Sequence, residues 1–297
     1  MEFLRTPDEQ FENLPDFDFT PNYIDIPSAE NARMHYVDTQ DGDELILMLH
    51  GEPSWSFLYR HMIHALKDDY RCVAPDLLGF GRSDKPTTIE DHTFEFHYQA
   101  LVDFVEALDL TNITLIVQDW GGLLGLPFAT EHDARIKRLV ILNTGLTTGE
   151  IPMGEGFMRW QQFAAKVGMR MVPGQLIQQS TVSDLSEEVV AAYNAPFPDK
   201  SYRAGVAAMP LLVPSEPDMA GAARHRAARD MLANYEKPVT VLFSDKDPVL
   251  GGAVKYFKKL IPQTKDDPTI EDGGHFLQED KGDVIAGHVR VFIERTA

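Results

Sequence analysis

A short apolar run that ends in a sharp turn constrains this chain more than any other stretch. Residues 113–117 are β-branched or aliphatic, the pattern of a strand buried on both faces of a sheet. Small residues follow at Gly121 and Gly122, and residues 123–129 continue with a helical pattern. A strand that turns directly into a helix is typical of a nucleophile elbow, whose apex residue projects from the top of the sheet.

The apex residue of this turn is an aspartate. The residues that align with the usual Gly-x-Ser-x-Gly pattern are 117–121, Val-Gln-Asp-Trp-Gly. Asp119 therefore takes the place of the serine, and Val117 takes the place of the first glycine. A carboxylate nucleophile attacks carbon and leaves an ester, whereas a serine attacks a carbonyl. The elbow thus predicts covalent catalysis through Asp119 and excludes a serine esterase.

The composition is that of a globular protein with an excess of acidic residues. The 297 residues are 43% hydrophobic and 25% charged, which suits one large domain or a core with a smaller insertion. The net charge of −19 would repel nucleic acid and anionic membranes, so we expect neither as a partner. The single cysteine, Cys72, excludes an internal disulfide, and no signal peptide or membrane-length apolar run is apparent. We expect a cytoplasmic protein.

The order of the predicted elements indicates an α/β fold. Short apolar strands alternate with helices, which favours a mostly parallel sheet flanked by helices. Residues 1–30 are expected to form an extended arm, and between residues 145 and 219 the alternation stops. We therefore predict a core of residues 1–144 and 220–297 with an inserted helical cap, residues 145–219. The predicted strands are residues 33–38, 45–49, 72–75, 113–117, 139–142, 238–243 and 268–271, and the predicted core helices are residues 57–66, 93–108, 123–129, 220–234, 251–260 and 282–294.

Two later loops supply the partners that a catalytic aspartate needs. The loop after the strand 238–243 contains Asp245 and Asp247, and we favour Asp247 because an aliphatic pair follows it closely. The loop after the last predicted strand, Asp-Gly-Gly-His, presents His275 behind small residues. The chain order nucleophile, acid, histidine is the order of α/β-hydrolases. We predict a triad of Asp119, Asp247 and His275, with Asp245 as the alternative acid.

Three further residues are candidates for binding the charges that develop during the reaction. The loop His-Gly-Glu-Pro at residues 50–53 ends an early strand, so the amides of Glu52 and Trp120 are predicted to form an oxyanion hole. The Trp120 indole is a donor only, so it can hold a departing anion such as a halide, although an unplaced tryptophan more often packs in a core. Trp160, early in the cap, could close over the same site. Trp55 is expected to be structural.

These residues together resemble the haloalkane dehalogenases of the α/β-hydrolase superfamily. The resemblance implies Asp119 as nucleophile, His275 as base, Asp247 as its partner, and Trp120 and Trp160 as halide donors. The matching stretches are residues 50–55, 75–86, 117–122, 195–202 and 273–276.

The resemblance is closer to one subfamily, in which an aspartate acid follows strand seven and two tryptophans bind the halide. The other subfamilies usually carry asparagine after His-Gly and an acid after strand six. Here the first position is Glu52, and residues 142–144, Leu-Asn-Thr, contain no acid.

The resemblance implies hydrolysis of a small apolar halogenated substrate to an alcohol, a halide ion and a proton, with no metal or organic cofactor. An epoxide hydrolase is the nearest alternative, but it needs acids such as cap tyrosines, and the predicted cap has only Tyr193 and Tyr202. A fluoroacetate-type dehalogenase would favour cationic residues beside the nucleophile, where Trp120 stands. A non-catalytic ligand-binding relative is the alternative of another class. Substrate length, halogen preference and oligomeric state stay open, a monomer included.

Overall fold

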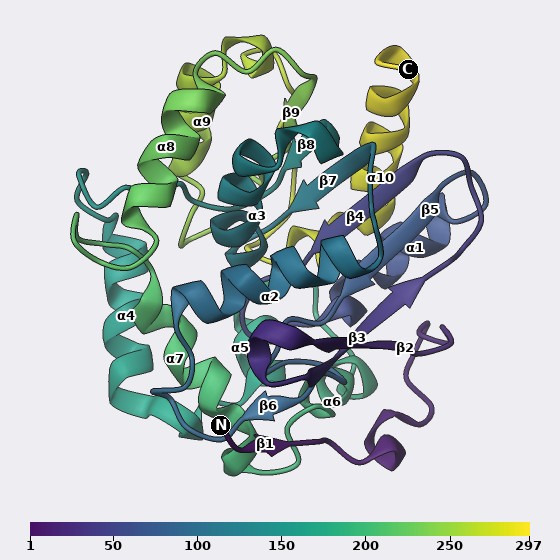
Figure 1. Ribbon diagram of the computed structural model, residues 1–297, viewed down its shortest axis with the longest axis vertical. Helices are drawn as coiled ribbons and strands as arrows, with labels where there is room; N and C mark the ends of the chain where they lie inside the picture. Colours follow the sequence, from purple (N-terminus) through teal and green to yellow (C-terminus); the bar gives the residue numbers. More distant parts are fainter.

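A central β-sheet organises the computed structural model, which describes all 297 residues (Figure 1). The strands of this sheet are β2 (Asn22–Ile26), β3 (Ala32–Asp38), β4 (Leu45–Leu49), β5 (Arg71–Pro75), β7 (Ile113–Val117), β8 (Ile136–Ile141) and β9 (Val239–Val241). They hydrogen-bond in the order β2-β3-β5-β4-β7-β8-β9. β3 is antiparallel to both of its neighbours, and the pairings from β5 to β9 are all parallel. A separate antiparallel pair joins β1 (Phe3–Leu4) to β6 (Lys85–Pro86).

Helices cover both faces of the sheet and one of its ends. They are α1 (Arg60–Leu66), α2 (Phe94–Ala107), α3 (Trp120–Glu131), α4 (Glu155–Val167), α5 (Pro173–Ser180), α6 (Glu187–Asn194), α7 (Ala204–Leu212), α8 (Ala222–Leu232), α9 (Ala253–Leu260) and α10 (Leu277–Arg295). α1 packs with α10 on one face, and α2, α3 and α8 lie on the other (Figure 1). The consecutive helices α4 to α7 lie beyond the carboxyl ends of the parallel strands (Figure 1). None of the helices could cross a lipid bilayer.

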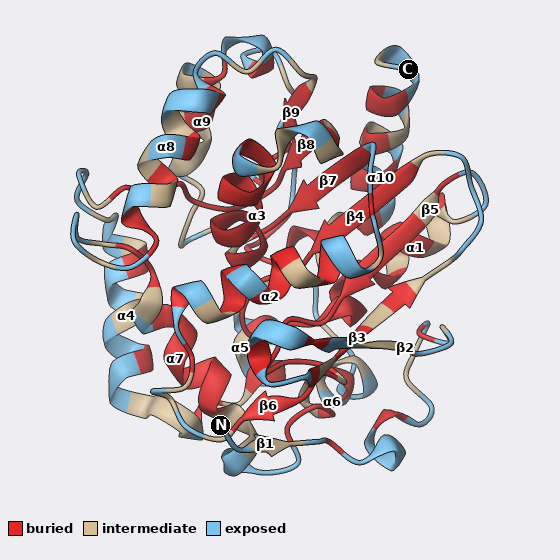
Figure 2. Ribbon diagram, in the orientation of Figure 1, coloured by how far each residue is buried: buried red, intermediate tan, exposed pale blue.

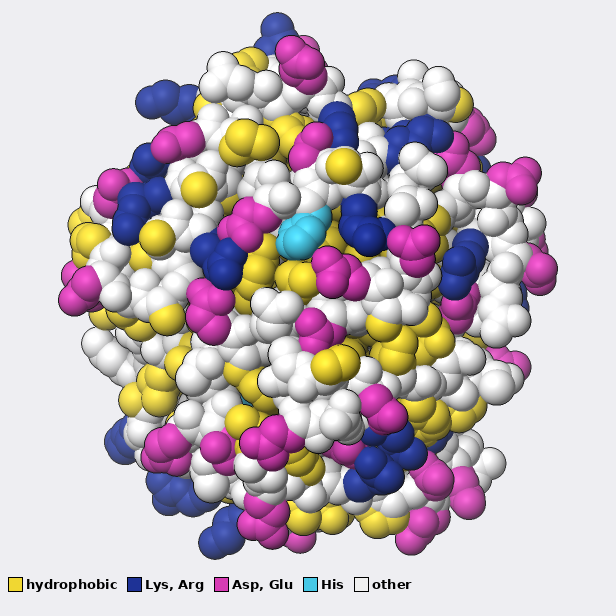
Figure 3. Space-filling view, viewed as in Figure 1, with side chains coloured by type: hydrophobic (Ala, Val, Ile, Leu, Met, Phe, Trp, Pro, Cys, Tyr) yellow, Lys and Arg dark blue, Asp and Glu magenta, His cyan; other side chains and the backbone are white.

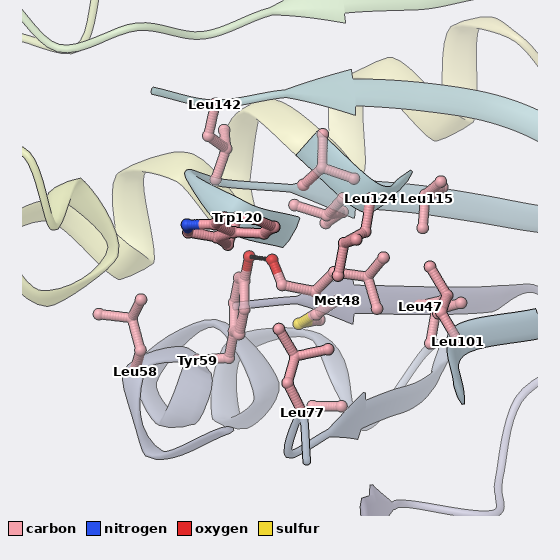
Figure 4. Packing of buried hydrophobic residues seen from close by; sticks show 14 of the residues in the cluster. Leu47, Met48, Leu58, Tyr59, Leu77, Leu101, Leu115, Trp120, Leu124 and Leu142 are labelled. Atoms are coloured by element: carbon pink, nitrogen blue, oxygen red, sulfur yellow. Dashed lines mark hydrogen bonds between the residues drawn. The ribbon is translucent and has the colours of Figure 1, made fainter. Parts of the chain in front are cut away.

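The centre of the sheet is buried on both faces, as its continuous apolar sequence predicts. Every residue of β4 and β7 is buried, and these strands form the red middle of Figure 2. Figure 4 shows how Trp120 packs beside Tyr59, whose hydroxyl donates a 2.9 Å hydrogen bond to the carbonyl of Leu49. α3 is buried on nearly all sides, since only its last residue is exposed. The helix that follows the elbow is thus fixed in the core.

Charged side chains lie on the surface. On the face that Figure 3 shows, the acidic side chains are spread among the basic ones.

The predicted α/β-hydrolase fold is confirmed, but several elements differ from the predicted ones; for example, β8 begins three residues early and α1 begins three residues late. Residues 22–26 of the expected arm form β2, because β3 leaves an edge on which an extended segment can pair. The strand expected at 268–271 is reduced to one bridge between Ile270 and Ser244. α3 begins three residues before the predicted start, because the helix follows directly from the apex of the elbow. α10 also begins early, with one extra turn before a kink at Lys281 (φ −142°, ψ 32°).

Candidate active site

The elbow between β7 and α3 holds its apex residue in a strained conformation. Asp119 has φ 49° and ψ −120°, outside the regions that L-residues ordinarily occupy. The turn can pack this closely against the sheet because two glycines, Gly121 and Gly122, follow Trp120. A Cβ atom at Gly121 would lie 2.0 Å from the carbonyl oxygen of Leu49, and one at Gly122 would lie 2.1 Å from Oγ1 of Thr144. Any larger residue at either position would push α3 away from the sheet.

The Asp119 carboxylate is held on one side and free on the other. Its Oδ1 accepts a 2.8 Å hydrogen bond from the backbone amide of Glu52, which follows β4. Its Oδ2 lies 3.6 Å from Nε2 of His275, an ion-pair distance that is too long for a hydrogen bond. The amide of Trp120 makes no hydrogen bond to this carboxylate, so its part in an oxyanion hole stays a prediction.

The orientation of the His275 ring is set by a buried acid. Nδ1 of His275 lies 2.9 Å from Oδ2 of Asp247, whose side chain is fully buried. Oδ1 of Asp247 accepts hydrogen bonds from the amides of Val249 (2.7 Å) and Leu250 (3.0 Å). Burial works against the Asp247 carboxylate, but His275 and these amides outweigh it and lower the pKa of Asp247. Asp247 therefore stays ionised, and it directs Nε2 of the imidazole toward Asp119.

The alternative acid, Asp245, lies outside this arrangement. Its side chain is exposed, and its one hydrogen bond is a long one of 3.4 Å that it accepts from the amide of Gly273.

The charge of His275 is set by its two neighbouring carboxylates. Burial disfavours the charged form of His275, but the attraction of Asp247 and of Asp119 is stronger and raises the pKa of His275 to about 10. While both carboxylates are charged, the imidazole is therefore protonated at neutral pH.

The backbone of the histidine loop is fixed by a network that the sequence did not reveal. Nδ2 of Asn143, two residues after the end of β8, donates to the carbonyl oxygens of Gly274 (2.9 Å) and His275 (3.2 Å). The Ser244 hydroxyl also donates to the Gly274 carbonyl, at 2.7 Å. The side chain of Gln118 donates to the His275 carbonyl at 3.3 Å. The available signal was positional, because a polar residue directly after a buried strand reaches the edge of the sheet where the loops meet.

A mostly apolar cavity lies beside this triad and receives side chains from both the core and the helices α4, α5 and α7. The cavity volume, taken as the space open to the centre of a water molecule, is about 60 Å³. Asp119, His275, Trp120, Glu52 and Trp160 all contribute to its wall. The nitrogen of Trp120 points away from Leu115 and Leu124 (Figure 4). The apolar part of the wall includes Leu123, Met153, Phe157, Leu176, Pro210, Val213 and Leu250.

The Glu52 side chain is unusual for an apolar wall. It is only 5% exposed, and its Oε1 has no hydrogen-bond partner. Burial, together with the negative charge of Asp119, raises the pKa of Glu52 well above its usual value. The cavity thus disfavours a second negative charge beside the nucleophile. No group of three or more His, Cys, Asp or Glu side chains has the arrangement of a metal site.

Comparison with known proteins relates this geometry to a family. The sequence model of the alpha/beta hydrolase fold matches residues 44–282. The haloalkane dehalogenase of Psychrobacter cryohalolentis is 47% identical and covers 99% of this chain and 98% of its own length. The haloalkane dehalogenase of Mycolicibacterium paratuberculosis is 42% identical over 97% of each chain. The chain belongs to the haloalkane dehalogenase family. A solved structure of this family, the tetrameric DpaA from Paraglaciecola agarilytica NO2, matches with a TM-score of 0.92 at 37% identity, over 97% of both chains.

Membership of the haloalkane dehalogenases agrees with the family resemblance that the sequence indicated. The structure brings all of the predicted site residues around one cavity, and these are Glu52, Asp119, Trp120, Trp160, Asp247 and His275. Asp247 is not part of the cavity wall, but it hydrogen-bonds His275, which is. Trp55 lies elsewhere, fully buried and stacked on Phe57 at a ring distance of 5.4 Å, as expected of a structural residue.

Proposed function

We propose that this haloalkane dehalogenase hydrolyses carbon–halogen bonds of small apolar haloalkanes, giving an alcohol, a halide ion and a proton. One observation carries the proposal: a carboxylate, an imidazole and two indoles contribute to the wall of the same apolar cavity. The carboxylate can attack carbon, the indoles can bind the anion that leaves, and the apolar wall excludes water that would solvate either charge.

In the first step, Asp119 displaces the halide. Oδ1 is engaged by the Glu52 amide, so Oδ2 is the oxygen free to attack the carbon on the side opposite the halogen. A new carbon–oxygen bond forms as the carbon–halogen bond breaks, and the electron pair leaves with the halide. The indole N–H groups of Trp120 and Trp160 stabilise the departing anion, because each offers a hydrogen bond and neither is a competing nucleophile.

In the second step, water cleaves the ester. Esterification removes the negative charge of Asp119, one of the two attractions that raise the pKa of His275, so the imidazole releases its proton to solvent and becomes able to accept another. It takes that proton from a water molecule that attacks the ester carbonyl. The negative charge then forms on the Asp119 carboxyl oxygen, where the amides of Glu52 and Trp120 stabilise it. As this intermediate collapses, the proton on His275 passes to the departing alkoxide, which leaves as the alcohol. Asp119 is left as a carboxyl group, which returns its proton to the imidazole and so becomes a carboxylate again.

The residues between β8 and α8 act in this proposal as a cap, residues 145–219. The α4 residues Phe157 and Trp160, with Leu176 of α5, close the cavity over the nucleophile. The size of the cavity limits the substrate to small molecules, because the space open to the centre of a water molecule is only about 60 Å³. Short haloalkanes such as 1,2-dibromoethane and 1-bromobutane fit this limit.

The contacts of the two cap tyrosines disfavour an epoxide hydrolase. That reaction needs an acid to protonate the ring oxygen as it opens. The hydroxyl of Tyr193 instead donates to the buried carboxylate of Glu279, and neither Tyr193 nor Tyr202 contributes to the cavity wall.

A direct assay compares halide release from 1-bromobutane with opening of styrene oxide by the same preparation. We expect stoichiometric alcohol and bromide from 1-bromobutane and no diol from styrene oxide. Diol formation without bromide release would replace the proposed function with epoxide hydrolysis.

Replacing either cavity tryptophan by phenylalanine is expected to weaken halide binding by roughly tenfold or more, since a hydrogen bond to a charged group contributes about 1.5–3 kcal/mol. The readout is the inhibition constant of added bromide in the turnover assay, for Trp120→Phe and Trp160→Phe. Trp55→Phe is the matched control, because the Trp55 indole nitrogen has no hydrogen-bond partner. An unchanged inhibition constant in both cavity variants would remove the tryptophans from the halide site.

A further inference from the structure

A single carboxylate in the first turn of α10 joins the histidine loop to the cap. Oδ2 of Asp280 accepts a 2.8 Å hydrogen bond from the amide of Gly274, the residue before His275. The same carboxylate accepts from the amides of Val182 (3.0 Å) and Ser183 (2.7 Å), in the link between α5 and α6. Hydrogen bonds to an ionised acceptor are among the strong ones. Asp280 therefore connects two segments that lie about ninety residues apart in the chain.

The backbone makes a second contact at the same place. The amide of His275 donates a 2.7 Å hydrogen bond to the carbonyl of Ser180, which is the last residue of α5 and also part of the cavity wall. The two segments approach so closely that only glycine fits at position 274, since a Cβ atom there would lie 2.3 Å from that carbonyl oxygen. The histidine loop is thus held by Asn143 on the side of the sheet and by Ser180 on the side of the cap.

The neighbouring residue fixes the start of α10 independently. Glu279 forms a buried ion pair with Arg60 at 2.6 Å and accepts from the Tyr193 hydroxyl of α6. With Glu279 anchored in this way, the adjacent Asp280 carboxylate has a defined position relative to both segments. The kink at Lys281 then separates this turn from the rest of α10. The turn of residues 277–280 is therefore tied to α1 and to the cap.

We propose that Asp280 is a positioning residue that holds the loop of His275 against cap residues 180–183, and so aligns the imidazole for hydrolysis of the ester. The inference rests on the proposed function, because only the second step uses His275 as a base. Displacement of halide by Asp119 does not need that alignment. Loss of Asp280 therefore slows ester hydrolysis and spares halide displacement, whereas simple loss of folded protein would reduce both steps in parallel.

The experiment measures the two steps separately in rapid-mixing assays with 1-bromobutane, for Asp280→Asn, Asp280→Ala and wild type. We expect the rate of the first halide release to stay within about twofold. We expect alcohol formation to fall by roughly tenfold to a hundredfold, as for an ångström-scale misplacement of a catalytic group. Asn keeps one acceptor oxygen, so its loss should be the smaller. Asp283→Asn, an exposed acid on the same helix, is the control and should behave as wild type.

A second measurement does not depend on activity. Amide hydrogen exchange in Asp280→Asn should be faster at residues 180–183 and 273–276 and unchanged in β4 and β7. Equal losses in both chemical steps, or unchanged exchange at both segments, would overturn the positioning role. Absence of halide release from wild type would instead contradict the proposed function, while the exchange result would still decide whether Asp280 joins the two segments.

Discussion

Replacing Asp119 by alanine is expected to abolish halide release from 1-bromobutane, with a loss in kcat/KM of roughly 10⁴-fold or more, the scale seen when a covalent nucleophile is removed. No other carboxylate can take its place. Glu52 is the only other acid in the cavity wall, and its raised pKa disfavours the charged form that could act as a nucleophile. Both steps of the reaction therefore fail, and no ester forms.

The measurement is bromide release over hours at high enzyme concentration, with circular dichroism to verify that the variant is folded. The control is Asp245→Ala, because Asp245 is an exposed acid near the histidine loop that makes no contact with the imidazole. It should retain most of the wild-type rate. If Asp119→Ala kept a substantial rate, or if Asp245→Ala lost as much, the elbow would not carry the nucleophile.

The parts of the fold that could be predicted from sequence are those whose local pattern has one structural solution. The continuous apolar run of β7, followed by Gly121 and Gly122, allows only a buried strand and a tight turn into a helix. The loop of His275 is similarly constrained by the two small residues before it. In contrast, β2 forms by pairing with the open edge of β3, which no local pattern marks. The segment at 268–271 pairs with the neighbouring chain through a single bridge, between Ile270 and Ser244, and so does not form a strand.

The parts of the site that could not be predicted act through the backbone. Asn143 and Asp280 hold the histidine loop by hydrogen bonds to carbonyl and amide groups, and such contacts need no particular residue at the partner position. A sequence pattern therefore does not mark them. Glu52 was predicted for its amide, which binds Asp119, but the burial of its side chain is set by the packing around the cavity. The size of the cavity depends on the same packing, so substrate length could be addressed only in three dimensions.

Replacing His275 by phenylalanine is expected to stop turnover after one chemical step. Asp119 still displaces the halide, so one equivalent of bromide per active site should appear in a burst. Hydrolysis then lacks its base, and the rate of alcohol formation should fall by roughly 10²–10⁴-fold, the contribution of general acid–base catalysis. Mass spectrometry of the intact protein should find one added butyl group, and proteolytic mapping should place it on Asp119.

This variant separates the roles of the two residues more sharply than a loss of activity does, because it leaves a covalent record of the first step. His275 also contributes a positive charge beside Asp119 in the free enzyme, so its removal leaves the carboxylate less stabilised and more nucleophilic, and the burst should not be slower than in wild type. His288→Phe, on α10, is the control and should turn over normally. Loss of the burst together with loss of turnover would mean that His275 is needed for halide displacement as well, which would contradict the proposed order of events.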